Sequence, residues 1–444
     1  MKFNKQQWEW IFYDWANSGY AMLVTTAVFP IYFKVVALQG GISSADSTAY
    51  WGYANSFSTL IIALLAPLLG ALADYPHAKR RWLNIFTWLG IVTAMILGSL
   101  PANGTMAWLW LIIVYVISNM GYSGSNLFYD SFLTDVADDE QMDEVSSAGF
   151  GFGYLGGVLS FAVFLVAELT NGFGILDGNG VARFSFWLSA GWWLLFAWPL
   201  MKNGQQRYGV PDTENRIANS WQRVLQTLRH INHYRQAFWF LVAYFFFIDG
   251  VDTIVTMATV IGEDLGIKTT TLMIVMLVVQ LIAAPFSMLY AWLAKKTSTR
   301  RALLLSIIVY MLICLYALKL KFAADFWVLA ILVGTSQGGI QALSRSYFGR
   351  LIPKSDSSEF FGFYNILGKF SAILGPVLVG LATQWTGNSR WGIFSLVILF
   401  VIGLVIFLIL PPVIGKIKNQ TAGLLTCVKH DSSLYYQCRL SSDR

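Results

Sequence analysis

The sequence predicts an all-α polytopic membrane protein with twelve transmembrane helices in two six-helix pseudo-repeats. Three observations predict it: 56% of the 444 residues are hydrophobic, only 12% are charged, and the apolar residues gather in runs of about 20. A soluble protein carries roughly twice that share of charged residues. The composition therefore excludes a disordered chain, a disulfide-stapled secreted domain and a nucleic-acid binder, and it makes the lipid bilayer the first expected partner.

The apolar runs, separated by turn and charge signals, divide the chain into twelve spans. The first half, 1–201, holds spans at 10–36, 51–73, 82–101, 106–129, 147–169 and 183–201. The second half, 237–412, holds spans at 237–261, 270–294, 302–321, 324–348, 361–386 and 392–412. A polar connection, 202–236, joins the halves. The polar stretch 413–444 has no periodicity, and we expect it to be a disordered tail.

Basic residues predict which side of the membrane each loop faces. With twelve spans both termini share one side, and 23 of the 30 Lys and Arg residues fall there, including Arg345 near the end of the tenth span. Six fall on the opposite side, and Lys369 alone is left within a span. Because basic loops stay in the cytoplasm, we expect cytoplasmic termini and a multi-pass protein of the bacterial inner (plasma) membrane.

The two halves repeat one another at an offset near 218 residues. Three pairs of segments match at or close to this offset: 119–133 with 337–351, 80–81 with 300–301, and 155–156 with 367–368. Chance similarity between glycine-rich helices is the alternative. An even number of spans per half implies repeats of the same orientation, related by an axis along the membrane normal. Two such bundles around a central cavity are the architecture of the major facilitator superfamily.

The loop after the second span has the features of a conformational gate between the halves. A glycine can let two helices approach, and Asp74 can face the positive N-terminal end of another helix, for which we expect the one that opens at Glu359. The predicted gate consists of Gly70, Asp74, Lys79, Arg80 and Arg81. An ordinary positively charged cytoplasmic loop is the alternative.

Three further segments complete a family resemblance. They are 12–21, which opens Phe-Tyr-Asp-Trp-Ala-Asn-Ser, 337–346, and 359–372, which contains Gly-Lys-Phe-Ser. With the loop, they make the chain resemble the vacuole-effluxer-like family of the major facilitator superfamily over all twelve spans. The loop departs from the superfamily pattern, since Tyr75 stands where a basic residue is common and His77 replaces a glycine. The resemblance implies secondary active transport, with amino-acid efflux the activity of the fungal vacuolar members.

Ionisable residues inside spans are costly, so each is a candidate for function. Asp249 and Asp252 are three residues apart in the seventh span and share one helix face. Two neighbouring carboxylates in a medium of low dielectric do not both ionise cheaply, which makes the pair the candidate site for a co-transported proton. A structural bridge from Lys369 to one of them is the alternative.

An amino acid needs an anionic partner for its ammonium and a cationic partner for its carboxylate. The spans offer Asp249 or Asp252 for the first and Lys369 for the second. Four amides from the first, fourth and tenth spans are the predicted neutral contacts: Asn17, Asn119, Gln337 and Gln341.

Two other patterns predict packing. Gly149, Gly153 and Gly157 recur every four residues in the fifth span, a spacing typical of closely packed helices. In the connection, an apolar stripe surrounded by arginines predicts an amphipathic helix at the membrane interface. The stripe consists of Ile217, Trp221, Val224, Leu225, Leu228 and Ile231.

No catalytic motif competes with transport. The sequence has no Gly-x-Ser-x-Gly, no His-Glu-x-x-His, no phosphate loop and no histidine within a span, so we predict no enzyme activity, no cofactor and no metal. The expected partners of a monomer are a small-molecule substrate and, where transport is coupled, a proton. Two alternatives stay open: a proton- or cation-coupled transporter of a sugar, peptide or drug-like solute, and a non-transporting membrane receptor with the same fold.

Overall fold

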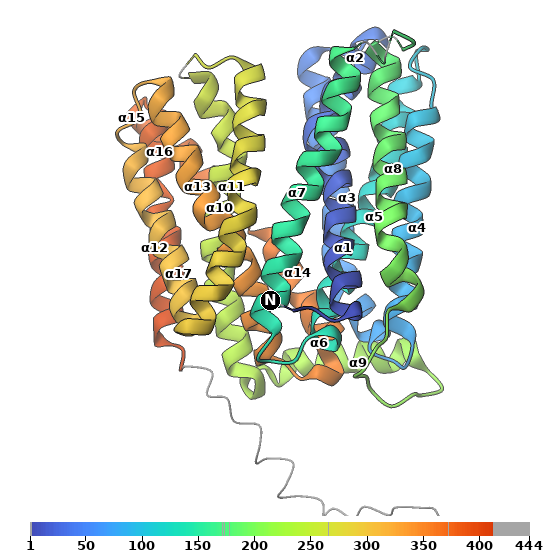
Figure 1. Cartoon of the computed structure of the whole chain (residues 1–444), viewed down its shortest axis with the longest axis vertical. Coiled ribbons are helices and arrows are strands. Elements are labelled where there is room, and N and C mark those ends of the chain that lie inside the picture. The colour runs from blue at the N-terminus through green and yellow to red at the C-terminus, as the bar shows by residue number, and fades with distance from the viewer. Residues whose placement is uncertain are drawn as a thin grey trace, which may run out of the picture. The chain divides into compact units, whose positions relative to one another are not determined.

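The computed structural model describes residues 2–411, apart from 171, 173, 177, 265 and 372. The described residues as far as Leu410 form one compact unit. The predicted disordered tail, 413–444, lies outside the described residues. Within the described ranges every regular element is a helix, as the sequence predicts (Figure 1).

The first half of the chain, called the N half, contains eight α-helices and a π-helical segment. They are α1 Lys5–Tyr20, η1 Ala21–Ala27, α2 Phe29–Gln39, α3 Ser44–Ala73, α4 Ala78–Ser99, α5 Ala107–Ser131, α6 Leu133–Val136, α7 Met142–Leu169 and α8 Gly178–Asn203. Local chemistry sets the ends: Asn4 and Gln7 form a capping box at α1, and the Ser43 hydroxyl accepts an N–H at the start of α3.

The connection and the second half follow. The connection contains α9 Arg216–Arg229 and the short 3-10 helix η2 Ile231–Tyr234. The C half contains α10 Arg235–Asp264, α11 Thr269–Lys296, α12 Thr299–Ala317, α13 Ala323–Leu351, η3 Lys354–Asp356, α14 Ser357–Phe370, α15 Leu374–Thr386, α16 Ser389–Ser395 and α17 Val397–Ile409. The eleventh predicted span is therefore interrupted between α14 and α15, and the twelfth between α16 and α17.

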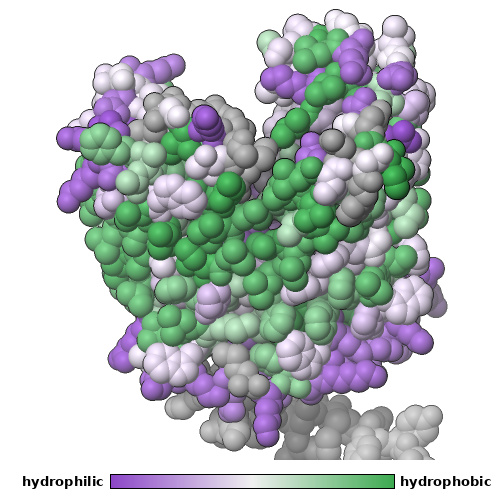
Figure 2. Space-filling model, turned by 45° about the horizontal axis from the view of Figure 1, so that its top comes forward, coloured by the Kyte–Doolittle hydropathy of each residue, from purple (hydrophilic) through white to green (hydrophobic). Residues whose placement is uncertain are grey.

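The described helices confirm a multi-pass membrane protein. Eleven of them are long and apolar enough to cross a bilayer, counting the α14–α15 and α16–α17 stretches as one helix each. The pair 5–27 and 29–39, bent by 40°, supplies a twelfth span. Figure 2 shows the result as a belt of apolar side chains between two hydrophilic rims.

The halves meet along two sets of helices. In the N half, α7 packs against α11 and α13, and α3 packs against α14. The chain's N-terminus, α6 and α9 lie at one end of the helices, at the bottom of Figure 1, which we call the α9 end. At the opposite end, called the cavity end, Figure 2 shows the surface hollowed between the halves.

Candidate functional site

A cavity of about 280 Å³ lies between the halves at the cavity end. Most of its lining is apolar and comes from η1, α10, α11 and α13, for example Met22, Val275 and Phe326. Its polar groups are few: Ser18, Thr26, Tyr154, Gln280 and Gln337. An apolar pocket with a small number of polar groups is the usual form of a small-molecule site.

Two of the predicted amides lie at this cavity or on its side towards the α9 end. Gln337 lines it, and its buried Oε1 has no hydrogen-bond partner in the described part of the chain. Gln341 lies one turn further along α13 towards the α9 end and accepts a hydrogen bond of 2.8 Å from the hydroxyl of Tyr154 on α7. The tenth span therefore presents two amide groups in succession between the halves.

The two predicted asparagines are used within the N half. Asn17 donates to the side chain of Asn126, and Asn119 donates to the Ser58 hydroxyl at 2.8 Å. Both are 3% exposed, and neither lines the cavity. In this conformation their amides hold helices of one half together.

The two aspartates of the seventh span differ in their surroundings. Asp249 is buried and accepts the backbone N–H of Gly375 at 2.9 Å, so it caps the start of α15 where the eleventh span is interrupted. Asp252 is partly exposed and lies three residues before Val255, which lines the cavity, so the two share a face of α10. The sequence predicts one shared role for the pair, whereas the structure gives Asp249 a structural contact of its own.

Lys369 is exposed and lies in the last turn of α14. It interacts electrostatically with Asp252 of the C half and with Asp130 of the N half. In the described part of the chain it forms no direct salt bridge, so the Lys–Asp bridge considered as an alternative is not formed in this conformation.

Arg345 corrects the sequence analysis. We counted it among the basic residues of the cytoplasmic side, but the structure buries it, 2% exposed, between the halves. Its Nη1 donates to Asp130 at 3.0 Å, and its Nη2 lies 3.8 Å from Asp14. Its Nε and Nη2 donate to the hydroxyl and carbonyl oxygens of Ser146, each at 3.0 Å. A buried arginine needs such partners, because an unpaired buried charge is strongly destabilising.

Aromatic rings surround the same guanidinium. Its carbon atom lies 4.7 Å from the ring centre of Trp10, 4.3 Å from Phe150 and 5.3 Å from Tyr129, which are cation–π distances. The predicted tenth span, 324–348, already contained Arg345. Its position inside a span was the available signal for a buried arginine, but the sequence analysis counted it with the cytoplasmic loops instead. Asp130 lay one residue beyond the predicted fourth span, whereas α5 continues to Ser131.

The glycine stripe of α7 makes room for these polar groups. A Cβ at Gly149 would lie 3.1 Å from Nη2 of Arg345, and one at Gly153 would lie 3.0 Å from the Asp14 carboxylate. A Cβ at Gly157 would lie 3.1 Å from the amide oxygen of Gln280, in the cavity. The stripe that the sequence assigns to helix packing therefore also accommodates side chains between the halves.

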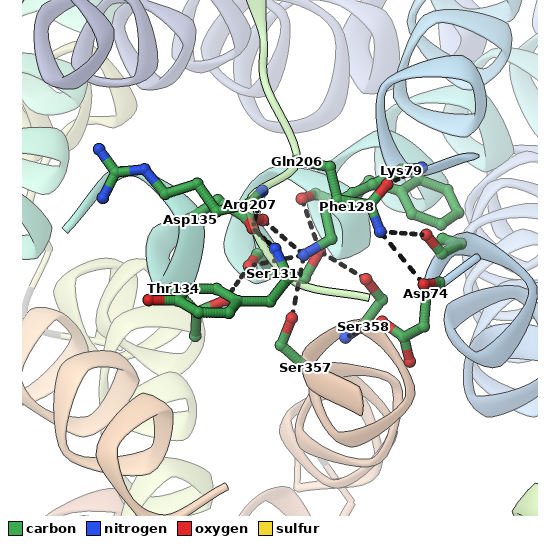
Figure 3. Close-up of polar contacts among 12 residues, drawn as sticks. Asp74, Lys79, Phe128, Ser131, Thr134, Asp135, Gln206, Arg207, Ser357 and Ser358 are labelled. Atoms are coloured by element: carbon green, nitrogen blue, oxygen red, sulfur yellow. Dashed lines mark hydrogen bonds and ion pairs between the residues drawn. The ribbon is translucent and has the colours of Figure 1, made fainter. Parts of the chain in front are cut away.

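At the α9 end, Asp74 makes the contact that the sequence predicts. Its carboxylate accepts the backbone N–H groups of Ser358 at 2.9 Å and Glu359 at 3.1 Å, at the start of α14. Figure 3 shows Asp74 beside Ser358. A Cβ at Gly70 would lie 2.9 Å from the Glu359 Cα and closer still to the Ser358 carbonyl oxygen. Gly70 is thus required for this approach of α3 to α14.

The basic residues of the loop divide into one that joins the halves and two that do not. Lys79 is fully buried, pairs with Asp135 at 2.6 Å and donates to the Ser357 hydroxyl of α14 at 2.9 Å (Figure 3). Arg80 is exposed and donates to the carbonyl of Lys202. Arg81 is exposed as well. The structure therefore leaves these two arginines out of the contact between α3 and α14 and corrects their place in the predicted gate.

Arg223 of α9 adds a contact that the sequence analysis missed. One of its nitrogens lies 3.3 Å from Asp74, 2.7 Å from Asp356 and 3.2 Å from Glu359, so one guanidinium is shared by three carboxylates from both halves. Burial raises the pKa of Asp74 to about 6, although Lys79, the N–H of Ser358 and Arg223 oppose the shift. We call Gly70, Asp74, Lys79, Arg223 and their α14 partners the seal.

The rest of α9 agrees with the predicted amphipathic helix. Ile217, Trp221 and Leu228 are exposed on one side, while Val224 is buried. The helix ends at Arg229, so Ile231, the last residue of the predicted stripe, falls in η2 instead. Arg223 lies on the side that faces α3, where its Nη1 donates to the carbonyl of Ala71 at 3.1 Å.

Comparisons with known proteins agree with this architecture. The family model described as vacuole effluxer Atg22 like matches residues 3–418. The MFS-type transporter YxiO of Bacillus subtilis (strain 168) is 46% identical over 92% of this chain and 96% of its own length. Autophagy-related protein 22 of Kluyveromyces lactis is 24% identical over 84% of this chain and 82% of its own length.

Solved structures show the same fold at low sequence identity. The fucose:proton symporter of E. coli aligns with a TM-score of 0.68 at 14% identity, over 90% of this chain and 96% of that one. A bacterial homologue of the iron transporter ferroportin, in an outward-facing state, aligns with a TM-score of 0.64 at 12% identity, over 91% and 99%.

Proposed function

Because the chain belongs to the vacuole effluxer Atg22-like family of the major facilitator superfamily, we propose that it exports an amino acid by alternating access. The observation that supports this most is the contrast between a cavity at one end of the halves and the seal at the other. A protein that alternates between two such states exposes one site to each side of a membrane in turn.

The membrane orientation is part of the proposal. We propose that the α9 end faces the cytoplasm of a bacterium, with both chain termini on that side of its inner membrane. Even without Arg345, most basic residues outside the spans belong to this side. We also propose a monomer, because the cavity and the seal are each complete within one chain.

The electrostatic interaction between Asp252 and Lys369 supports a zwitterionic substrate. We assign the ammonium to Asp252 and the carboxylate to Lys369, with Gln337 as a neutral contact. Asp249 is not assigned to the substrate, because its carboxylate caps α15. Where transport is coupled to a proton, Asp252 is also the proposed proton acceptor of this span, since its carboxylate makes no such backbone contact. The apolar lining accommodates the side chain of the substrate.

Counterflow in proteoliposomes tests the substrate class. Lys369→Ala should weaken binding of a transported amino acid roughly 30-fold or more, because losing one partner of a desolvated charge contact costs about 2 to 5 kcal/mol. The same change should spare an alkylamine, which lacks the carboxylate. Lys321→Ala, at an exposed position outside the spans, is the matched control.

Two results would contradict the assignment. The first is the absence of counterflow with every amino acid tested, in protein shown to open and close at the α9 end and the cavity end. The substrate is then another solute, such as a sugar or a peptide. If Lys369→Ala lowers thermal stability and adding Asp252→Ala restores it with no ligand-specific effect, the pair belongs to the scaffold.

A further inference from the structure

The partners of Arg345 are divided unequally between the halves. Every group that contacts the guanidinium belongs to the N half: Trp10 and Asp14 of α1, Tyr129 and Asp130 of α5, and Ser146 and Phe150 of α7. We call these six residues the cation box. Only Arg345 comes from the C half, on α13. When the halves separate at the α9 end, the box stays with one half and its cation leaves with the other.

The cation box is held together without Arg345. The Trp10 indole N–H donates to the Tyr129 carbonyl at 2.8 Å, and the two rings stack with centroids 4.5 Å apart. The Tyr129 hydroxyl donates to the Asp14 carboxylate at 3.0 Å. These bonds fix two rings and one carboxylate within the N half, so the box keeps its form when Arg345 withdraws.

Its chemistry selects organic cations. Aromatic faces and carboxylates together recognise ammonium and guanidinium groups, because ring quadrupoles and charge-assisted hydrogen bonds both favour a positive partner. An emptied box would hold two carboxylates, each at most 15% exposed in the closed state, without the guanidinium that pairs with them. When the α9 end opens, an entering cation competes with water and with protons for these two carboxylates.

We propose that the cation box is the loading site for the ammonium group of the substrate and that Arg345 occupies it while the seal is shut. The proposal rests on the proposed function, since it needs an amine-bearing substrate that enters at the α9 end. Arg345 then acts as an internal competitor. As the halves close, its guanidinium enters the box and displaces the substrate's ammonium towards the cavity.

The route for that displacement is visible along α13 and α7. Gln341 and Gln337 follow Arg345 at intervals of one turn, and Gln337 lines the cavity. Gly149 and Gly153 of α7 face the side chains of Arg345 and Asp14 along this path, and their lack of a Cβ leaves room for those groups. Lys369 interacts electrostatically with both Asp130 of the box and Asp252 of α10, so one cation is coupled to both proposed ammonium positions.

The first test empties the box in the closed state with Arg345→Ala. Methylguanidinium carries the lost group without its tether, and its binding is measured by the melting temperature of the purified full-length protein. We expect at least tenfold tighter apparent binding to Arg345→Ala than to the natural sequence, in which Arg345 competes. Adding Asp130→Asn should abolish the response. An equal response in the natural sequence, or one that survives Asp130→Asn, overturns the proposal.

Arg350→Ala is the matched control on the same helix. Arg350 pairs with Asp143 at 2.9 Å, outside the cation box. Its loss should give no gain in methylguanidinium binding, while potassium chloride at equal concentration controls for ionic strength in all variants.

The second test keeps Arg345 and uses Gly70→Ala, which prevents the seal from closing and so vacates the box. We expect n-butylammonium to bind this variant at least tenfold more tightly than it binds the natural sequence, as measured by the melting temperature. Adding Asp14→Asn or Asp130→Asn should remove this gain in binding. Butyrate should have no effect. If butyrate raises the melting temperature through the same residues, the box binds an anion and the proposal is overturned. If lowering the pH raises the melting temperature and n-butylammonium does not, the box binds a proton and the proposal is overturned.

The two proposals fail separately, because these tests measure binding without transport. If amino acids are transported and neither amine binds through Asp130, the cation box is wrong and the proposed function stands. If n-butylammonium binds through Asp130 and no amino acid is transported, the box stands and the amino-acid assignment is wrong.

Discussion

The boundary between the halves is built from different chemistry at its two ends. At the α9 end, charged side chains and backbone N–H groups join α3, α4 and α9 to α14 through bonds of about the usual hydrogen-bond length, such as Asp74 to Ser358 and Lys79 to Ser357. At the cavity end, the facing side chains are mostly apolar, and the halves enclose open space. One end is fastened by a few directional contacts, and the other is lined by surfaces without them.

The difference explains how one end can have two discrete states. Hydrogen bonds to charged groups contribute about 1.5 to 3 kcal/mol each and are lost over a short distance, so a seal made of them is either formed or broken. Apolar contact is not directional, and apolar walls can close around solutes of different shape. The comparison predicts that single substitutions in the seal change the population of states, whereas those in the cavity change binding.

The largest effect is expected for Gly70→Ala, because its Cβ would meet backbone atoms of α14 that cannot move aside. Overpacking of this kind costs about 3 kcal/mol, which disfavours the closed state more than a hundredfold. Spin labels at Arg81 and Thr297, both exposed at the α9 end on opposite halves, report the separation. Gly52→Ala is the control on the same helix, where a Cβ meets nothing within 4 Å. Equal label distances in the two variants would refute the role of α3 in the seal.

A smaller shift is expected for Arg223→Gln. Removing the guanidinium leaves Asp74, Asp356 and Glu359 facing one another, and we expect the closed state to lose about 2 kcal/mol, roughly 30-fold, because Arg223 is 21% exposed and partly screened. Arg216→Gln is the control on α9, since its pair with Asp212 is exposed. The same labels serve, and a shift as large in Arg216→Gln would show that α9 acts through its general charge.

The smallest effect is a pH dependence of the seal. The closed state raises the pKa of Asp74 to about 6, whereas an exposed aspartate in the open state has its ordinary value near 4. The closed state therefore binds the proton more tightly, its advantage is full below about pH 4, and it is lost as the pH rises through about 6. Between pH 7 and pH 5 we expect Asp74 to contribute roughly a tenfold shift towards the closed state, and Asp74→Asn should remove that contribution. Any pH dependence left in this variant belongs to Glu359, which shares Arg223 with Asp74, and Glu359→Gln should remove it. A shift in the opposite direction would show that another group controls the seal.

The contacts of Asp74 and Gly70 were predictable from the sequence because each depends on one helix end. An aspartate at the end of a span and the partial positive charge at the N-terminus of a facing helix attract one another in any arrangement that brings them together. Arg345 and Arg223 were not predictable in this way. Their roles depend on Asp130, Asp14 and the α14 carboxylates, which are more than 100 residues away in the chain. Counting the basic residues of each loop treats such residues as solvent-exposed, whereas these two contact carboxylates between the halves.

Asp249 shows a second limit of sequence reasoning. Its spacing from Asp252 predicts a shared face, which is correct for the helix, but its partner is the N–H of Gly375. That N–H is available only because α14 ends at Phe370 and α15 begins at Leu374, an interruption that an unbroken apolar run does not reveal. The site residues that failed as cavity contacts, Asn17 and Asn119 among them, likewise found partners that only the fold supplies.

Arg223 belongs to the stretch of chain that ties the two halves together. A tether of this kind sets a high effective concentration of one half near the other, and here the tether also supplies one of the fastening groups. A chain cut in the exposed stretch 211–214 and produced as two fragments would keep every residue of the seal. In the cut protein, however, α3 and α9 would lie on separate fragments, so forming the seal would require two molecules to associate. Dilution should therefore open the seal of the cut protein, although no contact has been removed.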